Sequence, residues 1–202
     1  MTQPAWRESV VAFIQAEAQP VDKYGHQPRL YALACQLGKG IEYDDDIVFA
    51  AAWMHDLGVF LGHRPEDPDE LKRWDHVPYT MARTRELLAL WGFPPEKLEG
   101  VLDAIRTHQP HDDPRLIEAI LLRDADMLEQ LGAVGILRAV CKVGRDTRYE
   151  TFSSVAPVLR KAVNELPGKL RLSSTKEIAV SRIETLRAFL TEMEHEAGGL
   201  LY

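Results

Sequence analysis

Apolar residues recur three and four positions apart along almost the whole 202-residue chain, and no segment shows the strict alternation of a strand. This spacing predicts an all-α fold. Capping and turn residues divide the pattern into helices over about residues 6–17, 22 or 25 to 37, 44–58, 75–91, 94–109 and 113–131, with further helices to about residue 196. The polar, proline-rich stretch 62–70 predicts a loop.

Composition narrows the class of protein. Hydrophobic residues make up 46% and charged residues 27%, which is typical of a soluble globular domain. The net charge of −7 argues against binding to nucleic acid polymers or anionic membranes, both of which need a basic surface. Cys35 and Cys141 lie far apart, so neither a disulfide framework nor a thiolate zinc site is indicated. The N-terminal residues do not resemble a signal peptide and no apolar run could cross a bilayer, so we expect a cytoplasmic protein.

The segment AAWMHDLG, residues 51–58, places His55 and Asp56 side by side in an apolar run. Burying an unpaired carboxylate is costly, so a core built for stability alone would not hold an aspartate there. Either the two side chains satisfy each other or a cation compensates them.

Other histidines are expected at helix ends. His26 and His108 each lie on an apolar stripe, and His76 opens a helix. For any one of them a hydrogen-bonded core or capping role is the simpler interpretation. Several together, beside an HD dipeptide, indicate a shared site. By contrast, histidines in polar loops or near the C-terminus are expected to be solvated: His63, His111 and His195.

Two aspartates interrupt the apolar segment near residue 125. Asp124 falls on the stripe of the neighbouring isoleucines and leucines, whereas Asp126 falls on the other side of the helix. Because apolar residues occupy both sides, this helix is expected to be buried all round, and periodicity leaves open which aspartate faces the site.

The order His26, His55-Asp56, Asp126 resembles the HD-domain superfamily of metal-dependent phosphohydrolases. His26 with Arg29 resembles the first histidine motif of the family, AAWMHDLG the motif that names it, and RDADMLEQLG (residues 123–132) its final aspartate motif. The resemblance implies one helical domain over 1–202, with a core of about 22–138 and a C-terminal extension of about 139–202. It also implies four metal ligands: His26, His55, Asp56 and Asp126.

His76 and His108 fall where members with two extra histidines carry them, so the resemblance implies that both line the pocket further out, where they could bind phosphate oxygens, protonate the leaving oxygen or hold a second metal. With Asp56 they are the expected catalytic residues. Some members carry a glutamate three residues after the HD aspartate as a general base; here that residue is Val59. Phosphate binding also needs positive charge. Arg64, Arg73 and Arg145 are candidates, although each could simply be solvated.

Two imidazoles and two carboxylates favour Mn, Fe, Co or Ni, with Mg or Zn as less favoured ions. Such an ion would activate water and polarise a phosphorus centre. The sequence therefore predicts hydrolysis of a small phosphorylated compound, with a nucleotide as the expected class. The alternatives are a di-iron oxygenase of the HD type and a non-catalytic, metal-stabilised nucleotide-binding module. A purely structural helical protein explains least, and the oligomeric state stays open, a homodimer included.

Overall fold

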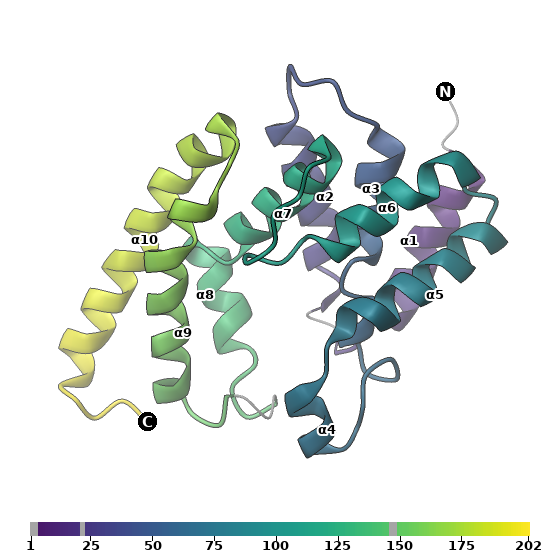
Figure 1. Ribbon diagram of the computed structural model, residues 1–202. Helices are drawn as coiled ribbons and strands as arrows, with labels where there is room; N and C mark the ends of the chain where they lie inside the picture. Colours follow the sequence, from purple (N-terminus) through teal and green to yellow (C-terminus); the bar gives the residue numbers. More distant parts are fainter. Residues whose placement is uncertain (1–3, 21–22, 146–148) are drawn as a thin grey trace. The chain divides into compact units, whose positions relative to one another are not determined.

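The computed structural model describes residues 4–20, 23–145 and 149–202. Within these residues the chain forms ten α-helices and no strand, which confirms the predicted all-α fold (Figure 1). The helices are α1 (Ala5–Glu17), α2 (His26–Leu37), α3 (Asp45–Met54), α4 (Pro68–Arg73), α5 (His76–Leu90), α6 (Leu98–Arg106), α7 (Ile117–Glu129), α8 (Gly132–Val140), α9 (Phe152–Glu165) and α10 (Ser173–Ala197). None of the described helices is long and apolar enough to span a membrane.

The chain divides into two compact units, residues 1–125 and 126–202. The boundary lies within α7, and the predicted core of about residues 22–138 includes it. Residue 22, where that core and one predicted helix begin, lies outside the described residues. In the second unit α8, α9 and α10 pack against one another around buried side chains such as Leu159 and Leu186.

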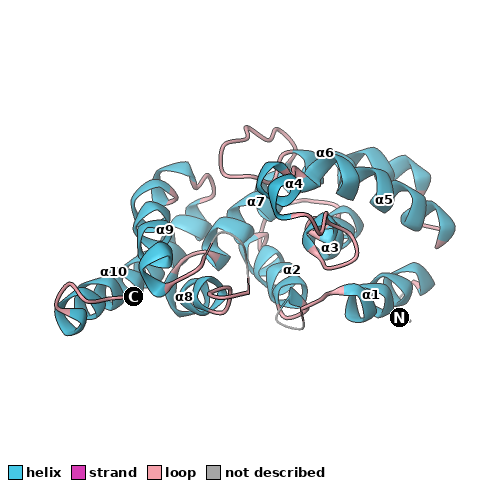
Figure 2. Ribbon diagram, turned by 90° about the horizontal axis from the view of Figure 1, so that it is seen from below, coloured by secondary structure: helices cyan, strands magenta, loops and turns pink. Residues whose placement is uncertain are grey.

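Helix α3 is the centre of the first unit. Figure 2 shows it flanked by α1, α2 and α6, all of which contact it. Every residue from Val48 to Met54 is buried, and three consecutive alanines, Ala50 to Ala52, let the neighbouring helices approach closely. A helix buried on all sides is held firmly, so the residues at its two ends have fixed positions.

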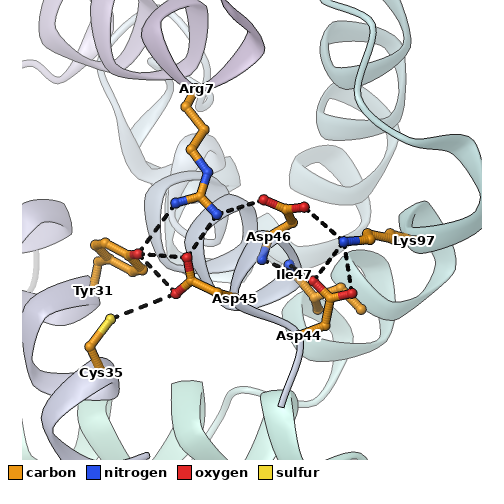
Figure 3. A network of polar contacts seen from close by, with 8 residues as sticks. All are labelled: Arg7, Tyr31, Cys35, Asp44, Asp45, Asp46, Ile47 and Lys97. Atoms are coloured by element: carbon orange, nitrogen blue, oxygen red, sulfur yellow. Dashed lines mark hydrogen bonds and ion pairs between the residues drawn. The ribbon is translucent and has the colours of Figure 1, made fainter. Parts of the chain in front are cut away.

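A network of charged side chains holds the N-terminal end of α3 (Figure 3). Asp44 caps the helix, because its carboxylate accepts from the backbone N–H of Asp46 at 2.9 Å. Arg7 of α1 donates to Asp45 at 2.8 Å and to Asp46 at 2.6 Å. Lys97 donates to Asp46 at 2.7 Å and also binds Asp44. The acidic first turn therefore ties α3 to α1 and to the segment before α6.

One helix was not expected. The predicted loop 62–70 contains the start of α4, which begins at Pro68 and has no buried residue. Its capping chemistry explains it: Asp67 accepts from the N–H groups of Asp69 and Glu70, and Pro68 occupies the first turn. A short helix without an apolar stripe gives no periodic signal, so only its capping residues could have predicted it.

The prediction for His63 is also wrong. Its imidazole is only 9% exposed, because it lies between the Tyr79 hydroxyl at 2.8 Å and the Glu17 carboxylate at 2.9 Å. These partners come from α5 and α1, far from His63 in the sequence, and a local polar pattern cannot reveal them. His111 and His195 are exposed, as predicted.

Candidate metal centre

The HD pair lies at the C-terminal end of α3. His55 is the residue that ends the helix, and Asp56 follows it before the short 3-10 turn Leu57–Val59. Residues within a helix point about 100° apart, but Asp56 has left the helical backbone (φ −104°, ψ 14°). The two side chains can therefore approach one point, and their Nε2 and Oδ2 atoms are 3.6 Å apart.

Backbone carbonyls orient two of the imidazoles. The Nδ1 atom of His55 lies 3.1 Å from the carbonyl oxygen of Ala52, and that of His108 lies 2.6 Å from the carbonyl oxygen of Ile105. A carbonyl oxygen only accepts, so each Nδ1 carries the proton and donates. The neutral ring then has a lone pair on Nε2, which is the arrangement found in metal-binding histidines.

Two groups of side chains meet at Asp56 in the first unit. The first consists of His26, His55 and Asp56; the second consists of Asp56, His76 and His108. In each group the ligand atoms lie within 4.8 Å of one another. Both histidine pairs therefore share a single carboxylate.

In the first group His26, at the start of α2, faces His55. Their Nε2 atoms are 3.3 Å apart, and the Nε2 of His26 lies 3.9 Å from Asp56 Oδ2. Both histidines are buried. Two ligands bound at right angles to one ion, each about 2.2 Å away, would be about 3.1 Å apart. The observed separation fits a shared divalent ion.

The second group uses the other oxygen of the same carboxylate. His76, the first residue of α5, places its Nε2 3.5 Å from Asp56 Oδ1. The rings of His76 and His108 meet edge to face with centroids 5.5 Å apart, and His108 also contacts the His55 ring at 5.1 Å. The structure thus brings these two histidines, which the sequence places further out in the pocket, next to Asp56; their catalytic role stays a prediction.

The carboxylate of Asp56 is ionised in this setting. Burial raises its pKa, but the positive charge that the surrounding imidazoles can carry outweighs burial and holds the pKa well below the usual value. The Asp56 side chain is 21% exposed, and its carboxylate faces four imidazoles. Together these groups provide oxygen and nitrogen donors and no thiolate. Such a donor set could hold a divalent metal ion.

The aspartates of α7 differ in burial. Asp124 has no exposed side-chain area and lies 3.9 Å from the Arg123 guanidinium, whereas Asp126 is 13% exposed. Asp126 belongs to the second unit, where its carboxylate accepts from Gln130 at 3.2 Å and faces Arg138 at 3.9 Å. The assignment of Asp126 as a fourth ligand stays a prediction.

The three predicted phosphate-binding arginines lie in different places. Arg64 follows His63 and is half-buried, and Arg73 is exposed in the last turn of α4. Arg145 belongs to the second unit, where its guanidinium donates to the carbonyl oxygen of Cys141 at the end of α8. Phosphate binding by these three arginines stays a prediction.

The sequence reasoning missed the role of Arg123. Its buried guanidinium donates to the carbonyl oxygens of Gln109 at 3.1 Å and Pro110 at 2.8 Å. These are the two residues after His108, so Arg123 fixes the turn that carries this histidine. A charged residue inside the apolar segment AILLRDADML was a usable signal, because a buried guanidinium needs partners.

Comparison with known proteins identifies the family. The sequence-family model of the HD domain matches residues 24–131 of this chain, which include all four predicted ligands and both additional histidines. The chain belongs to the HD domain family. This match confirms the resemblance seen in the sequence.

Relatives of this HD protein agree in fold. YpgQ of Bacillus subtilis (strain 168), named an uncharacterized protein, is 26% identical over 184 residues, which span 87% of this chain and 84% of YpgQ. A crystal structure of YpgQ superposes with a TM-score of 0.70 at 24% identity, covering 98% of this chain and 99% of that one. An HD-superfamily hydrolase from Bacillus thuringiensis gives 0.67 at 19% identity, covering 96% and 97%.

Proposed function

We propose that the chain is a metal-dependent phosphohydrolase that acts on a small phosphorylated compound, with a nucleotide as the substrate class. One observation carries the proposal: the Asp56 carboxylate is shared by a buried His26–His55 pair and by a His76–His108 pair. The first pair suits an ion, and the second suits a substrate bound next to it.

His26, His55 and Asp56 would hold the ion, with Asp126 as the proposed fourth ligand. A divalent ion supplies Lewis acidity there: it lowers the pKa of water and withdraws charge from a phosphate group. Mn, Fe, Co and Ni suit the mixed nitrogen and oxygen donors best, ahead of Mg and Zn. The contact of the His55 ring with the Ala52 carbonyl directs its Nε2 lone pair, so this ligand is arranged before any ion binds.

The second pair would move protons. The Nδ1–H of His108 is committed to Ile105, so its Nε2 is the atom available to accept or donate a proton at the substrate. His76 Nε2, beside Asp56 Oδ1, is the second candidate. Val59 cannot act as a base, and the family's glutamate position is therefore filled by an inert side chain. We assign the proton transfers to His76 and His108.

A relative supports the nucleotide class. YpgQ has been crystallised in complex with ADP; that structure superposes with a TM-score of 0.67 at 22% identity and covers 96% of this chain and 98% of YpgQ. A diphosphate needs positive charge around its oxygens, and Arg64, Arg73 and Arg145 remain the proposed groups for that role.

A second candidate function is oxygen chemistry at two iron ions. The observation that favours it is the second group, because Asp56, His76 and His108 could hold a second ion. A non-catalytic nucleotide-binding module would use the same ligands and differ only in lacking turnover.

Phosphate release from a panel of nucleotides and sugar phosphates, measured in parallel with Mn, Co, Ni and Mg, tests these functions. We expect turnover by the wild type and none by Asp56→Asn, with Asp69→Asn of the exposed helix α4 as the control. Nucleotide binding without turnover under every metal would favour the binding module. Oxygen consumption that requires iron would favour the oxygenase.

A further inference from the structure

Both backbone polar groups of Gly58 are bound by side chains that flank His76. The Gly58 N–H donates to the Thr80 hydroxyl at 3.0 Å, and the indole Nε1–H of Trp74 donates to the Gly58 carbonyl oxygen at 2.8 Å. Trp74 lies two residues before His76 and Thr80 lies one helical turn after it. The residues on either side of His76 are therefore attached to the same glycine.

The start of α5 also rests directly on Gly58. A methyl group on Gly58 would lie 2.8 Å from the carbonyl oxygen of His76, 3.0 Å from its Cβ and 3.0 Å from the Thr80 hydroxyl oxygen. No side chain fits in that space, so only glycine allows the helix to approach this closely. The contact is with the backbone and Cβ of His76 itself.

Gly58 follows Asp56 by two residues, so this attachment sets the distance between the two functional side chains. The imidazole of His76 reaches Asp56 at 3.5 Å from a backbone that Gly58, Thr80 and Trp74 hold in place. A helix shift of about 1 Å would separate them, and misplacement on that scale can reduce turnover by about 100-fold.

We propose that Thr80 is a positioning residue that acts through His76: its hydroxyl accepts the Gly58 N–H and so fixes His76 beside Asp56. This inference rests on the proposed function, in which His76 transfers a proton at the substrate. Thr80 has no exposed area and does not belong to either group of candidate ligands.

Thr84 provides a matched control. It lies one turn after Thr80 on the buried side of α5 and also has no exposed area. Unlike Thr80, its hydroxyl has no hydrogen-bond partner among the described residues. Thr80→Val and Thr84→Val are therefore the same isosteric change in the same helix, and only the first removes a hydrogen bond.

Steady-state kinetics and Mn binding of the two variants test the proposal. We expect Thr80→Val to lower kcat about 10-fold to 100-fold without changing KM or Mn affinity, and Thr84→Val to change none of them. Thr80→Ser, which retains the hydroxyl, should recover most of the loss. In a His76→Ala background Thr80→Val should have no further effect, because a residue that acts only through His76 is not additive with its removal.

Equal kinetics for Thr80→Val and Thr84→Val would overturn the proposal, as would additive effects of Thr80→Val and His76→Ala. Should Thr80→Val fail to fold, Trp74→Phe removes the other hydrogen bond to Gly58 and is expected to lower kcat in the same way. The ¹⁵N resonances of the His76 ring give a readout without substrate: they should shift in Thr80→Val and stay in place in Thr84→Val. A wild type that hydrolyses nothing would defeat the proposed function, while unshifted His76 resonances in Thr80→Val would defeat the positioning role.

Discussion

The Nε2 atoms of His26 and His55 face each other at 3.3 Å, although the two residues are 29 positions apart in the chain. Because His55 donates its Nδ1–H to Ala52, its Nε2 presents a lone pair toward His26. Only a proton on His26 Nε2 or a cation between the rings can stabilise that approach. A metal-binding measurement separates the two.

Mn should stabilise the wild type, because an ion that binds only the folded state adds to the free energy of unfolding. At about 100 times the dissociation constant the gain is about 2.7 kcal/mol, or a rise in Tm of roughly 5–10 °C. His26→Ala, His55→Ala and Asp56→Ala should lose most of this rise in thermal melts with and without Mn. His195→Ala, on the exposed side of α10, should keep it. A wild type without any Mn-dependent shift would make the His–Asp set an ordinary core network.

His76→Ala and His108→Ala should separate proton transfer from ion binding. We expect each to lower kcat by about 100-fold or more, since the Nε2 atom that moves a proton is lost. Both should retain the Mn-dependent rise in Tm, because neither belongs to the first group of ligands. Loss of that rise in His108→Ala would make His108 a primary ligand and contradict this division of roles.

Isosteric variants of the two aspartates of α7 test which of them is the fourth metal ligand. Asp126→Asn should weaken Mn binding strongly and change the stability of the metal-free protein little, because Asp126 is partly exposed. Asp124→Asn should destabilise the metal-free protein, by about 3 kcal/mol, since it leaves the buried Arg123 charge without its neighbouring carboxylate. Urea unfolding and Mn titration measure the two effects. The opposite outcome would move the ligand to Asp124.

The network at the start of α3 should make stability depend on pH. Burial raises the pKa of Asp46, but its hydrogen bonds from Lys97 and Arg7 outweigh burial and lower the pKa below its usual value. The ionised carboxylate therefore stabilises the fold fully above the unfolded pKa of about 4, and this contribution is lost as the pH falls through the folded pKa. Asp46→Asn should cost about 1–3 kcal/mol at pH 7.

Urea unfolding at a series of pH values checks this sign. The difference between wild type and Asp46→Asn should be constant from pH 7 to about pH 5 and should shrink below about pH 4. Asp69→Asn, whose partner Lys72 is also exposed, should show almost no difference at any pH. A difference that grows toward low pH would contradict the assigned direction of the Asp46 pKa.

Much of the fold and of the candidate site could be predicted from the sequence, because the apolar residues recur periodically and a buried charged group is energetically costly. The inward placement of His26 and His108 followed from their apolar stripes, and the burial of both is confirmed. His55 and Asp56 stand out in the sequence because a carboxylate in an alanine-rich apolar run needs compensation. Three consecutive aspartates, Asp44 to Asp46, are a sequence signal for the capped start of α3.

The rest depends on contacts between distant segments. His63 was expected in solvent, and its partners Glu17 and Tyr79 come from two other helices. The attachment of Thr80 to Gly58 spans 22 residues and leaves no mark in the local pattern. For Asp124 and Asp126, a helix buried on both sides gives no periodic preference, and the structure distinguishes them by their burial and by their partners.

The single carboxylate at the junction of the two histidine pairs also limits how the site can be redesigned. An engineer could delete His76 and His108 and keep three donors on one side, or delete His26 and His55 and keep three on the other. Neither simplified site can dispense with Asp56. Mutational libraries aimed at new metals or new substrates can therefore vary the four histidines in pairs, while position 56 must stay fixed in every member.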